Sequence, residues 1–280
     1  MKNRVMNEQM LQNFERHLQM DERSEATVRK YLHDVRCFFR YQENISVCKQ
    51  SVLDYKSWLQ QEYALSSANS MLAALNAFFR CCGWNELCVK QFKVQKQVYC
   101  SEEKELSRSE YIRLLDAAKK QKKHRLGLMI QTICATGIRV SELQYITLES
   151  LYKGEAVVCC KGKNRRIFLV SKLKKKLLAY AKDMGIEHGP IFISKNGRPL
   201  DRSNVWKEMK SICAQAGVQS SKVFPHNLRH LFARIFYSLE KDIAKLADVL
   251  GHASIDTTRI YIISSGAEHK RQLEHMKLII

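Results

Sequence analysis

The sequence predicts a two-domain protein whose fold is mainly α with a small β element. Three features of the chain support this class. Apolar residues recur at helical spacing through the first hundred residues, this pattern breaks between residues 90 and 105, and two short β-branched runs lie beyond the break. At 280 residues, the chain is long enough for two domains that each bury their own core.

The N-terminal domain is expected to be a bundle of short helices. Val28, Leu32 and Val35 fall on one helical face, and Ser24 stands where a residue caps the start of that helix. A later helix is expected to stop at Gly83, because glycine readily takes the left-handed conformation that ends helices. The expected helices cover residues 7–19, 24–42, 51–61 and about 66–83.

A polar segment separates the two domains. The apolar pattern stops in QFKVQKQVYCSEEKE, and a helix capped near Ser107 follows it. We therefore assign residues 1–98 to the N-terminal domain, 99–105 to a linker and 106–280 to the second domain. The composition of the linker leaves open whether the domains close as a clamp or pack rigidly together.

The second domain begins with helices and then changes its pattern. Helices are expected over residues 107–120 and 126–135, and a Thr-Gly turn follows them. Residues 155–160 and 165–170 are short β-branched and apolar runs on either side of Lys-Gly-Lys-Asn, which predicts a hairpin with a Gly/Asn turn. From residue 171 onward the pattern is helical again.

The composition favours a polyanionic partner inside the cell. The formal net charge is +19, although a solvated basic surface would account for the charge as well. Because the N-terminus is polar and no apolar run is long enough to span a membrane, we expect a cytoplasmic protein, in the bacterial cytoplasm or nucleoid. The ten cysteines include no C-x-x-C pair, so neither a disulfide nor a zinc site is expected.

Three segments of the second domain hold the most informative residues: ATGIRVSEL (135–143), PHNLRHLFA (225–233) and LGHASIDTTRIYI (250–262). Together they resemble the tyrosine recombinase, or phage integrase, family. They match its leading arginine motif, its H-x-x-R box and its L-G-H box, which precedes the nucleophile position. The family's hairpin lysine also has a counterpart. The resemblance therefore places the catalytic residues at Arg139, Lys161, His226, Arg229, His252 and Tyr261.

The resemblance implies a compact, Xer-type site-specific recombinase or integrase. It implies a helical, SAM-like core-binding domain, a mixed α/β catalytic domain, a 3′-phosphotyrosine intermediate and a Holliday junction. Double-stranded DNA sites would be the substrate, with neither metal nor nucleotide cofactor. In the family, tails such as residues 264–280 commonly dock into a neighbouring protomer, which suggests a tetramer on two duplexes. Accessory DNA-bending proteins are an optional further partner, and docking of the tail onto its own domain is the alternative.

Several other basic residues are expected to contact DNA. Two lie on the hairpin and three on the second N-terminal helix, where a purely solvated face is the alternative. These residues are Lys163, Arg165, Arg29, Lys30 and Arg36.

The expected catalytic residues also make chemical sense by themselves. Cleavage by a phenol needs a nucleophile, cations on the non-bridging phosphate oxygens and an acid for the departing 5′ oxygen. Arg139 and Arg229 have planar guanidinium groups suited to phosphate. The family assigns the acid to Lys161, and His226 and His252 titrate close enough to neutral pH to assist proton transfer.

Other interpretations of these residues stay open. His226, His230 and His252 could bind a metal, but the glutamate of an H-E-x-x-H site is absent, so we expect no metal and a packing role for His230. Tyr145 and Tyr237 are rival nucleophiles outside the motif and are expected to be structural.

Two rival functions remain. A type IB topoisomerase uses similar chemistry without exchanging partners, and a non-catalytic DNA-binding relative would have lost an active-site residue. The target site, the directionality factors and the kind of substrate (phage, transposon or chromosome-dimer site) are not encoded in these patterns.

Overall fold

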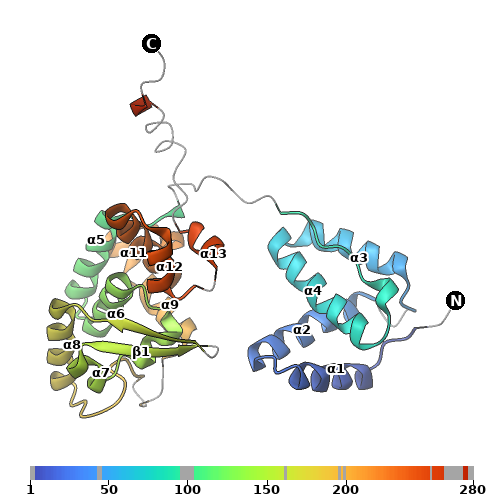
Figure 1. Ribbon diagram of the computed structural model, residues 1–280, viewed down its shortest axis with the longest axis horizontal. Coiled ribbons are helices and arrows are strands. Elements are labelled where there is room, and N and C mark those ends of the chain that lie inside the picture. Colours follow the sequence, from blue (N-terminus) through green and yellow to red (C-terminus); the bar gives the residue numbers. More distant parts are fainter. Residues whose placement is uncertain are drawn as a thin grey trace. The chain divides into compact units, whose positions relative to one another are not determined.

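A computed structural model divides the chain into two compact units, residues 1–96 and 97–280 (Figure 1). It describes residues 4–42, 46–94, 104–160, 163–194, 197, 200–252, 254–261 and 274–276. Within these ranges, no helix is both long and apolar enough to cross a membrane.

The N-terminal unit is a bundle of helices, as predicted. In its described part, the helices are α1 (Glu8–Met20), α2 (Glu25–Gln42), α3 (Lys49–Glu62) and α4 (Leu65–Cys81), followed by the 3-10 helix η1 (Asn85–Leu87). The Ser24 hydroxyl accepts a hydrogen bond from the Thr27 N–H, which confirms the expected start of α2. Gly83 has a φ of +72° just beyond α4, as expected of a helix terminator.

Aromatic side chains fill the core of the N-terminal unit. The Phe14 and Phe78 rings meet edge to face with centroids 5.4 Å apart, and Phe38 meets Tyr55 at 4.8 Å. All four side chains are fully buried. Such contacts stabilise a core beyond simple area burial. These two join α1 to α4 and α2 to α3, and the contact of Phe38 with Phe79, at 5.9 Å, joins α2 to α4.

The C-terminal unit combines helices with one hairpin. Its described elements are α5 (Arg108–Lys120), α6 (His124–Thr136), η3 (Val140–Tyr145), α7 (Leu148–Lys153), β1 (Glu155–Cys160), β2 (Lys163–Phe168), α8 (Ser171–Asp183), α9 (Arg202–Lys210), α10 (Cys213–Ala216), η4 (Ser220–Lys222), α11 (Pro225–Glu240), α12 (Ile243–Leu250) and α13 (Ile255–Arg259). The predicted class, mainly α with a small β element, is confirmed.

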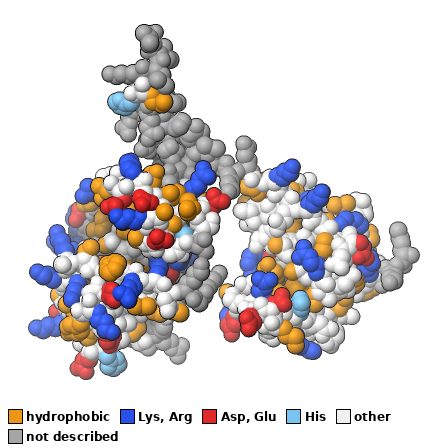
Figure 2. Space-filling model, in the orientation of Figure 1, with side chains coloured by type: hydrophobic (Ala, Val, Ile, Leu, Met, Phe, Trp, Pro, Cys, Tyr) orange, Lys and Arg blue, Asp and Glu red, His pale blue; other side chains and the backbone are white. Residues whose placement is uncertain are grey.

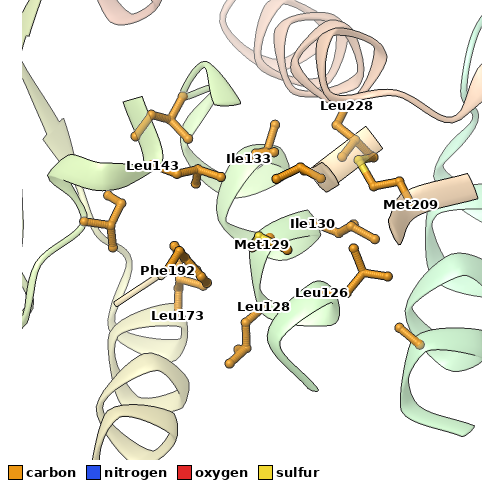
Figure 3. Close-up of a cluster of buried hydrophobic side chains, with 14 of the residues drawn as sticks. Leu126, Leu128, Met129, Ile130, Ile133, Leu143, Leu173, Phe192, Met209 and Leu228 are labelled. Carbon is orange, nitrogen blue, oxygen red and sulfur yellow. The ribbon is translucent and has the colours of Figure 1, made fainter. Parts of the chain in front are cut away.

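Helix α6 is the centre of the C-terminal unit. It packs against α5, α8, α9 and α11, so apolar side chains surround it instead of forming one stripe (Figure 3). Ile130 and Ile133 are fully buried, and Leu228 of α11 and Met209 of α9 belong to the same core. This core fixes the positions of the elements that begin or end beside α6.

The hairpin differs from the prediction in one respect. β2 begins at Lys163, not at residue 165, and Cys160 pairs with Lys163. The predicted four-residue Lys-Gly-Lys-Asn turn was therefore wrong, because Lys163 and Asn164 pair within the strand. This register pairs Val158 with Arg165 on the inward face, while Arg166 faces outward.

Candidate active site

A glycine turn leads from α6 to Arg139. Gly137 ends α6 with a φ of +63°, and a Cβ at this position would lie 2.5 Å from a ring carbon of Phe232. Only glycine fits both the conformation and the space. The chain then extends through Arg139, which stands at the N-cap of η3.

Glu142 holds two arginines at the site. It accepts hydrogen bonds from the backbone N–H of Arg139 at 2.9 Å and from its Nη1 at 2.8 Å, and it also forms an ion pair with Arg165. Burial alone would raise the pKa of Glu142, but the Arg139 hydrogen bonds and the two positive charges lower it overall. Glu142 was not predicted from the sequence, although its place three residues after Arg139 in an apolar stretch was a usable signal.

Arg229 is fixed from several directions. It lies on the first turns of α11, where Pro225 occupies the first helical position, and only 1% of the residue is exposed. Its guanidinium donates to the carbonyls of Gly137 and Leu250, the latter at 2.7 Å. Its buried Nε has no hydrogen-bond partner within the described residues. Burial lowers the pKa of Arg229 to about 10, so the group stays charged at neutral pH.

Tyr261 lies among three histidine rings. Its hydroxyl is 3.3 Å from Nε2 of His226, and its ring stacks on His230 with centroids 4.2 Å apart. The His252 ring centroid is 5.2 Å away. Only 5% of Tyr261 is exposed. The short helix α13 and its buried Thr258, which hydrogen-bonds to His252 at 2.8 Å, set this position.

The histidines are neutral at pH 7. Burial, followed by the charge of Arg229, lowers the pKa of His252 to about 4, and burial likewise lowers the pKa of His230 to about 4. The pKa of His226 is also lowered, first by burial and then by Arg229. His252 Nε2 lies 3.0 Å from Nη2 of Arg229, which can only donate, so the imidazole proton is on Nδ1.

These side chains together suit a phosphate more than a metal. Arg139, His226 and Arg229 line one pocket of about 740 Å³. In the described part of the chain, no group of three or more His, Cys, Asp or Glu residues is arranged to hold a metal ion. An anion between the two guanidiniums would lie beside a phenol whose neighbouring imidazole can accept a proton.

The three basic residues predicted on the hairpin are described by the structure to different extents. Lys161 lies outside the described residues, and of Lys163 only the backbone, at the start of β2, is described. The Arg165 side chain is 12% exposed, and besides Glu142 it donates to the Val249 carbonyl at 2.8 Å. Arg165 therefore joins the hairpin to the segment that precedes His252.

The basic residues predicted on α2 are at the surface of the N-terminal unit. Arg29, Lys30 and Arg36 have largely exposed side chains, and each forms an ion pair with a carboxylate. The partners are Glu25, Asp34 and Glu8, respectively. The pairs of Arg29 and Arg36 are exposed on both sides, and surface pairs of this kind are weak and exchange readily for other anions. The Asp34 carboxylate paired with Lys30 is buried.

The rival tyrosines have other contacts. The Tyr145 hydroxyl donates to the Cys159 carbonyl of β1 at 3.0 Å, and the Tyr237 ring lies 5.7 Å from the Lys241 ammonium. Neither contact is to Arg139, His226, Arg229 or His252.

Comparisons with known proteins agree in both units. Residues 104–268 match the profile described as the phage integrase family, and residues 11–85 match its N-terminal SAM-like domain. Tyrosine recombinase XerA of Pyrococcus furiosus is 27% identical over 289 residues, which covers 100% of this chain and 98% of that protein. Tyrosine recombinase XerD of Oceanobacillus iheyensis is 33% identical over 167 residues, or 56% of each chain. A lambda integrase dimer, solved bound to a COC′ core site, has the same fold with a TM-score of 0.74 at 18% identity, over 92% of this chain and 95% of that one.

Proposed function

The chain belongs to the phage integrase family and is a tyrosine recombinase, and we propose that it recombines specific DNA sites with Tyr261 as its nucleophile. The observation that carries this proposal is the position of the Tyr261 hydroxyl, 3.3 Å from the neutral imidazole of His226 and in the same site as the buried guanidinium of Arg229. A phenol needs both a proton acceptor and a bound phosphate before it can attack phosphorus.

The proposed reaction assigns each residue one task. Arg139 and Arg229 bind the non-bridging oxygens of the scissile phosphate, and His226 accepts the phenolic proton as Tyr261 attacks phosphorus. The bond from phosphorus to the 5′ oxygen breaks, and Lys161 donates a proton to that oxygen. His252 keeps Arg229 oriented through their 3.0 Å contact. A 5′ hydroxyl from a partner strand then attacks the phosphotyrosine, which releases Tyr261 and reseals the DNA.

The proposed substrate is double-stranded DNA bound by an oligomer. Lysine and arginine side chains lie on the visible face of each unit (Figure 2), and the net charge is +19. Lys163, Arg165, Arg29, Lys30 and Arg36 are proposed phosphate contacts. Lambda integrase has been solved as a tetramer bound to a Holliday junction. By analogy we propose a tetramer in which the tails, residues 264–280, are exchanged between protomers. We propose that this tetramer acts at the nucleoid, where accessory DNA-bending proteins are available.

Covalent trapping tests the proposal. The substrate is a duplex selected from a random-sequence library by its binding to the Tyr261→Phe protein. This duplex carries a nick close to the cleavage position. After cleavage, the short fragment beyond the nick diffuses away, so the covalent adduct accumulates. The unaltered protein should form an adduct, whereas Tyr261→Phe should bind equally well and form none, because only the hydroxyl is lost. An adduct with Tyr261→Phe would assign the nucleophile to another residue.

The same duplex separates recombination from relaxation. A recombinase joins strands from two differently marked duplexes, whereas a type IB topoisomerase relaxes a supercoiled plasmid without exchanging partners. We expect joined products of both parental duplexes from the unaltered protein.

A further inference from the structure

The pocket beside Arg139 and Arg229 is larger than one phosphate needs. Its volume of about 740 Å³ lies in the range of sites that enclose a whole small molecule, whereas a phosphate group is much smaller. Part of its wall comes from α9, a helix that the sequence did not connect with the active site.

The helical period explains which residues form that wall. Val205 and Met209 are buried in the core four positions apart, so they define the inner face of α9. Ser203, Trp206 and Lys207 point away from that inner face, and Arg202 is the first residue of α9. All four line the pocket, and 46% of Trp206 is exposed.

The charges of this wall favour an anion. No aspartate or glutamate is among the described residues that line the pocket. Asp201, next in sequence, caps α9: its Oδ1 accepts hydrogen bonds from the backbone N–H groups of Ser203 at 2.8 Å and Asn204 at 3.2 Å. Arg202 and Lys207 make no ion pair within the described part of the chain, in contrast to Arg139.

We propose that Arg202 and Lys207 bind the DNA phosphate next to the scissile one on the cleaved strand, with Trp206 packed against the intervening deoxyribose. This inference rests on the proposed function. Consecutive phosphates of one strand are a short step apart, about 3.4 Å of rise along the duplex, so two sets of cations that line one pocket match two neighbouring phosphates. The indole of Trp206, which has the Lys210 ammonium 5.1 Å from its ring centroid, supplies an apolar surface in the same pocket.

Removing single phosphate charges tests the proposal. All binding measurements use the Tyr261→Phe protein and the duplex selected with it. A neutral methylphosphonate is placed in turn at each phosphate near the cleavage position, and binding is compared with and without Arg202→Ala and Lys207→Ala together. At one position adjacent to the scissile phosphate, the methylphosphonate should weaken the binding of the Tyr261→Phe protein by about tenfold. The same methylphosphonate should have little effect on the binding of the protein that also carries Arg202→Ala and Lys207→Ala.

Salt dependence provides a second readout. Losing one phosphate contact should reduce the slope of log Kd against log salt by about 0.9. The matched control is Lys172→Ala with Lys175→Ala, which removes two exposed charges from α8, a helix that packs on α6 and α7 away from this pocket. Trp206→Ala should weaken binding several-fold with an unchanged slope, and Trp206→Phe should restore most of the loss.

The outcomes distinguish this inference from the proposed function. If the double alanine variant matches the α8 control in slope and remains sensitive at every methylphosphonate position, the second phosphate site is wrong. That result leaves the proposed function intact as long as the unaltered protein forms its covalent adduct. Absence of the adduct on the selected duplex would instead overturn the proposed function.

Discussion

The imidazole of His230 lies flat against the ring of Tyr261, with an angle of 28° between the planes. Because this histidine is neutral, its ring packs against the phenol without placing a charge beside it. The sequence predicted only a packing role for His230. The structure shows that what it packs against is the proposed nucleophile.

His230→Ala should therefore slow adduct formation by about tenfold or more, because an unsupported phenol spends less time aimed at phosphorus. Binding of the uncut duplex should not change. His230→Phe retains a flat ring and should recover most of the rate. Single-turnover trapping on the nicked duplex measures all three proteins, and a His230→Phe protein as slow as His230→Ala would show that the imidazole nitrogens are required.

The same histidines make stability depend on pH. The pKa values of His230 and His252 are about 4 in the folded protein, below the ordinary 6.5, so the unfolded chain binds more protons between these values. The contribution of these histidines to the free energy of unfolding should be greatest above about pH 6.5 and should fall as the pH approaches 4. Urea titrations across this range should show a shallower fall in His230→Phe, and an identical fall would contradict the assignment.

Glu142 is the residue whose loss should cost the most stability at the site. Its removal leaves Arg139 and the mostly buried Arg165 without their shared carboxylate. Breaking a buried ion pair in this way typically costs about 3–5 kcal/mol. Urea unfolding of Glu142→Ala should show such a loss, whereas Glu155→Ala, which breaks a 3.9 Å surface pair, should cost less than about 1 kcal/mol. Similar losses in both variants would mean that Glu142 is not the anchor of the two arginines.

At the scale of elements, Gly137 connects helix packing to the active site. Its turn ends α6 against Phe232, and its carbonyl accepts a hydrogen bond from Arg229. Gly137→Ala should therefore cost more stability than Gly217→Ala, which also has a positive φ but has open space around it. We expect a difference of about 1–3 kcal/mol in urea unfolding, the usual cost of overpacking, together with slower adduct formation. Equal losses would show that the space near Phe232 is not limiting.

The elements were predictable wherever a local rule decided them. α2 and α4 follow from apolar period and end signals. His226, Arg229 and Tyr261 were assigned through the resemblance of their motifs to those of the tyrosine recombinase family. The start of β2 was missed because Lys163 and Asn164 have the composition of a turn but pair in the strand. The α9 wall could not be predicted, because only the tertiary fold brings Arg202 beside a pocket that also contains Arg139.

At the scale of the whole molecule, the tail is the feature expected to join protomers. Most of residues 264–280 lie outside the described residues, but the end of the chain, from Met276 to Ile280, is rich in apolar residues. Deleting residues 267–280 should weaken synapsis of two duplexes by about tenfold or more while binding of a single site is nearly retained. Gel-shift titration measures both complexes. Equal loss of folding and assembly would show that the tail packs onto its own domain.

The register of the hairpin also limits how this protein can change over generations. The Arg165 side chain is on the inward face of β2. One residue added or lost within β2 would shift the register, so that Arg165 faced solvent and a residue that now faces solvent faced inward. The contacts to Glu142 and to the Val249 carbonyl would be lost together. A longer hairpin therefore keeps these contacts only if the added residues are placed between the strands, outside the paired positions of β1 and β2.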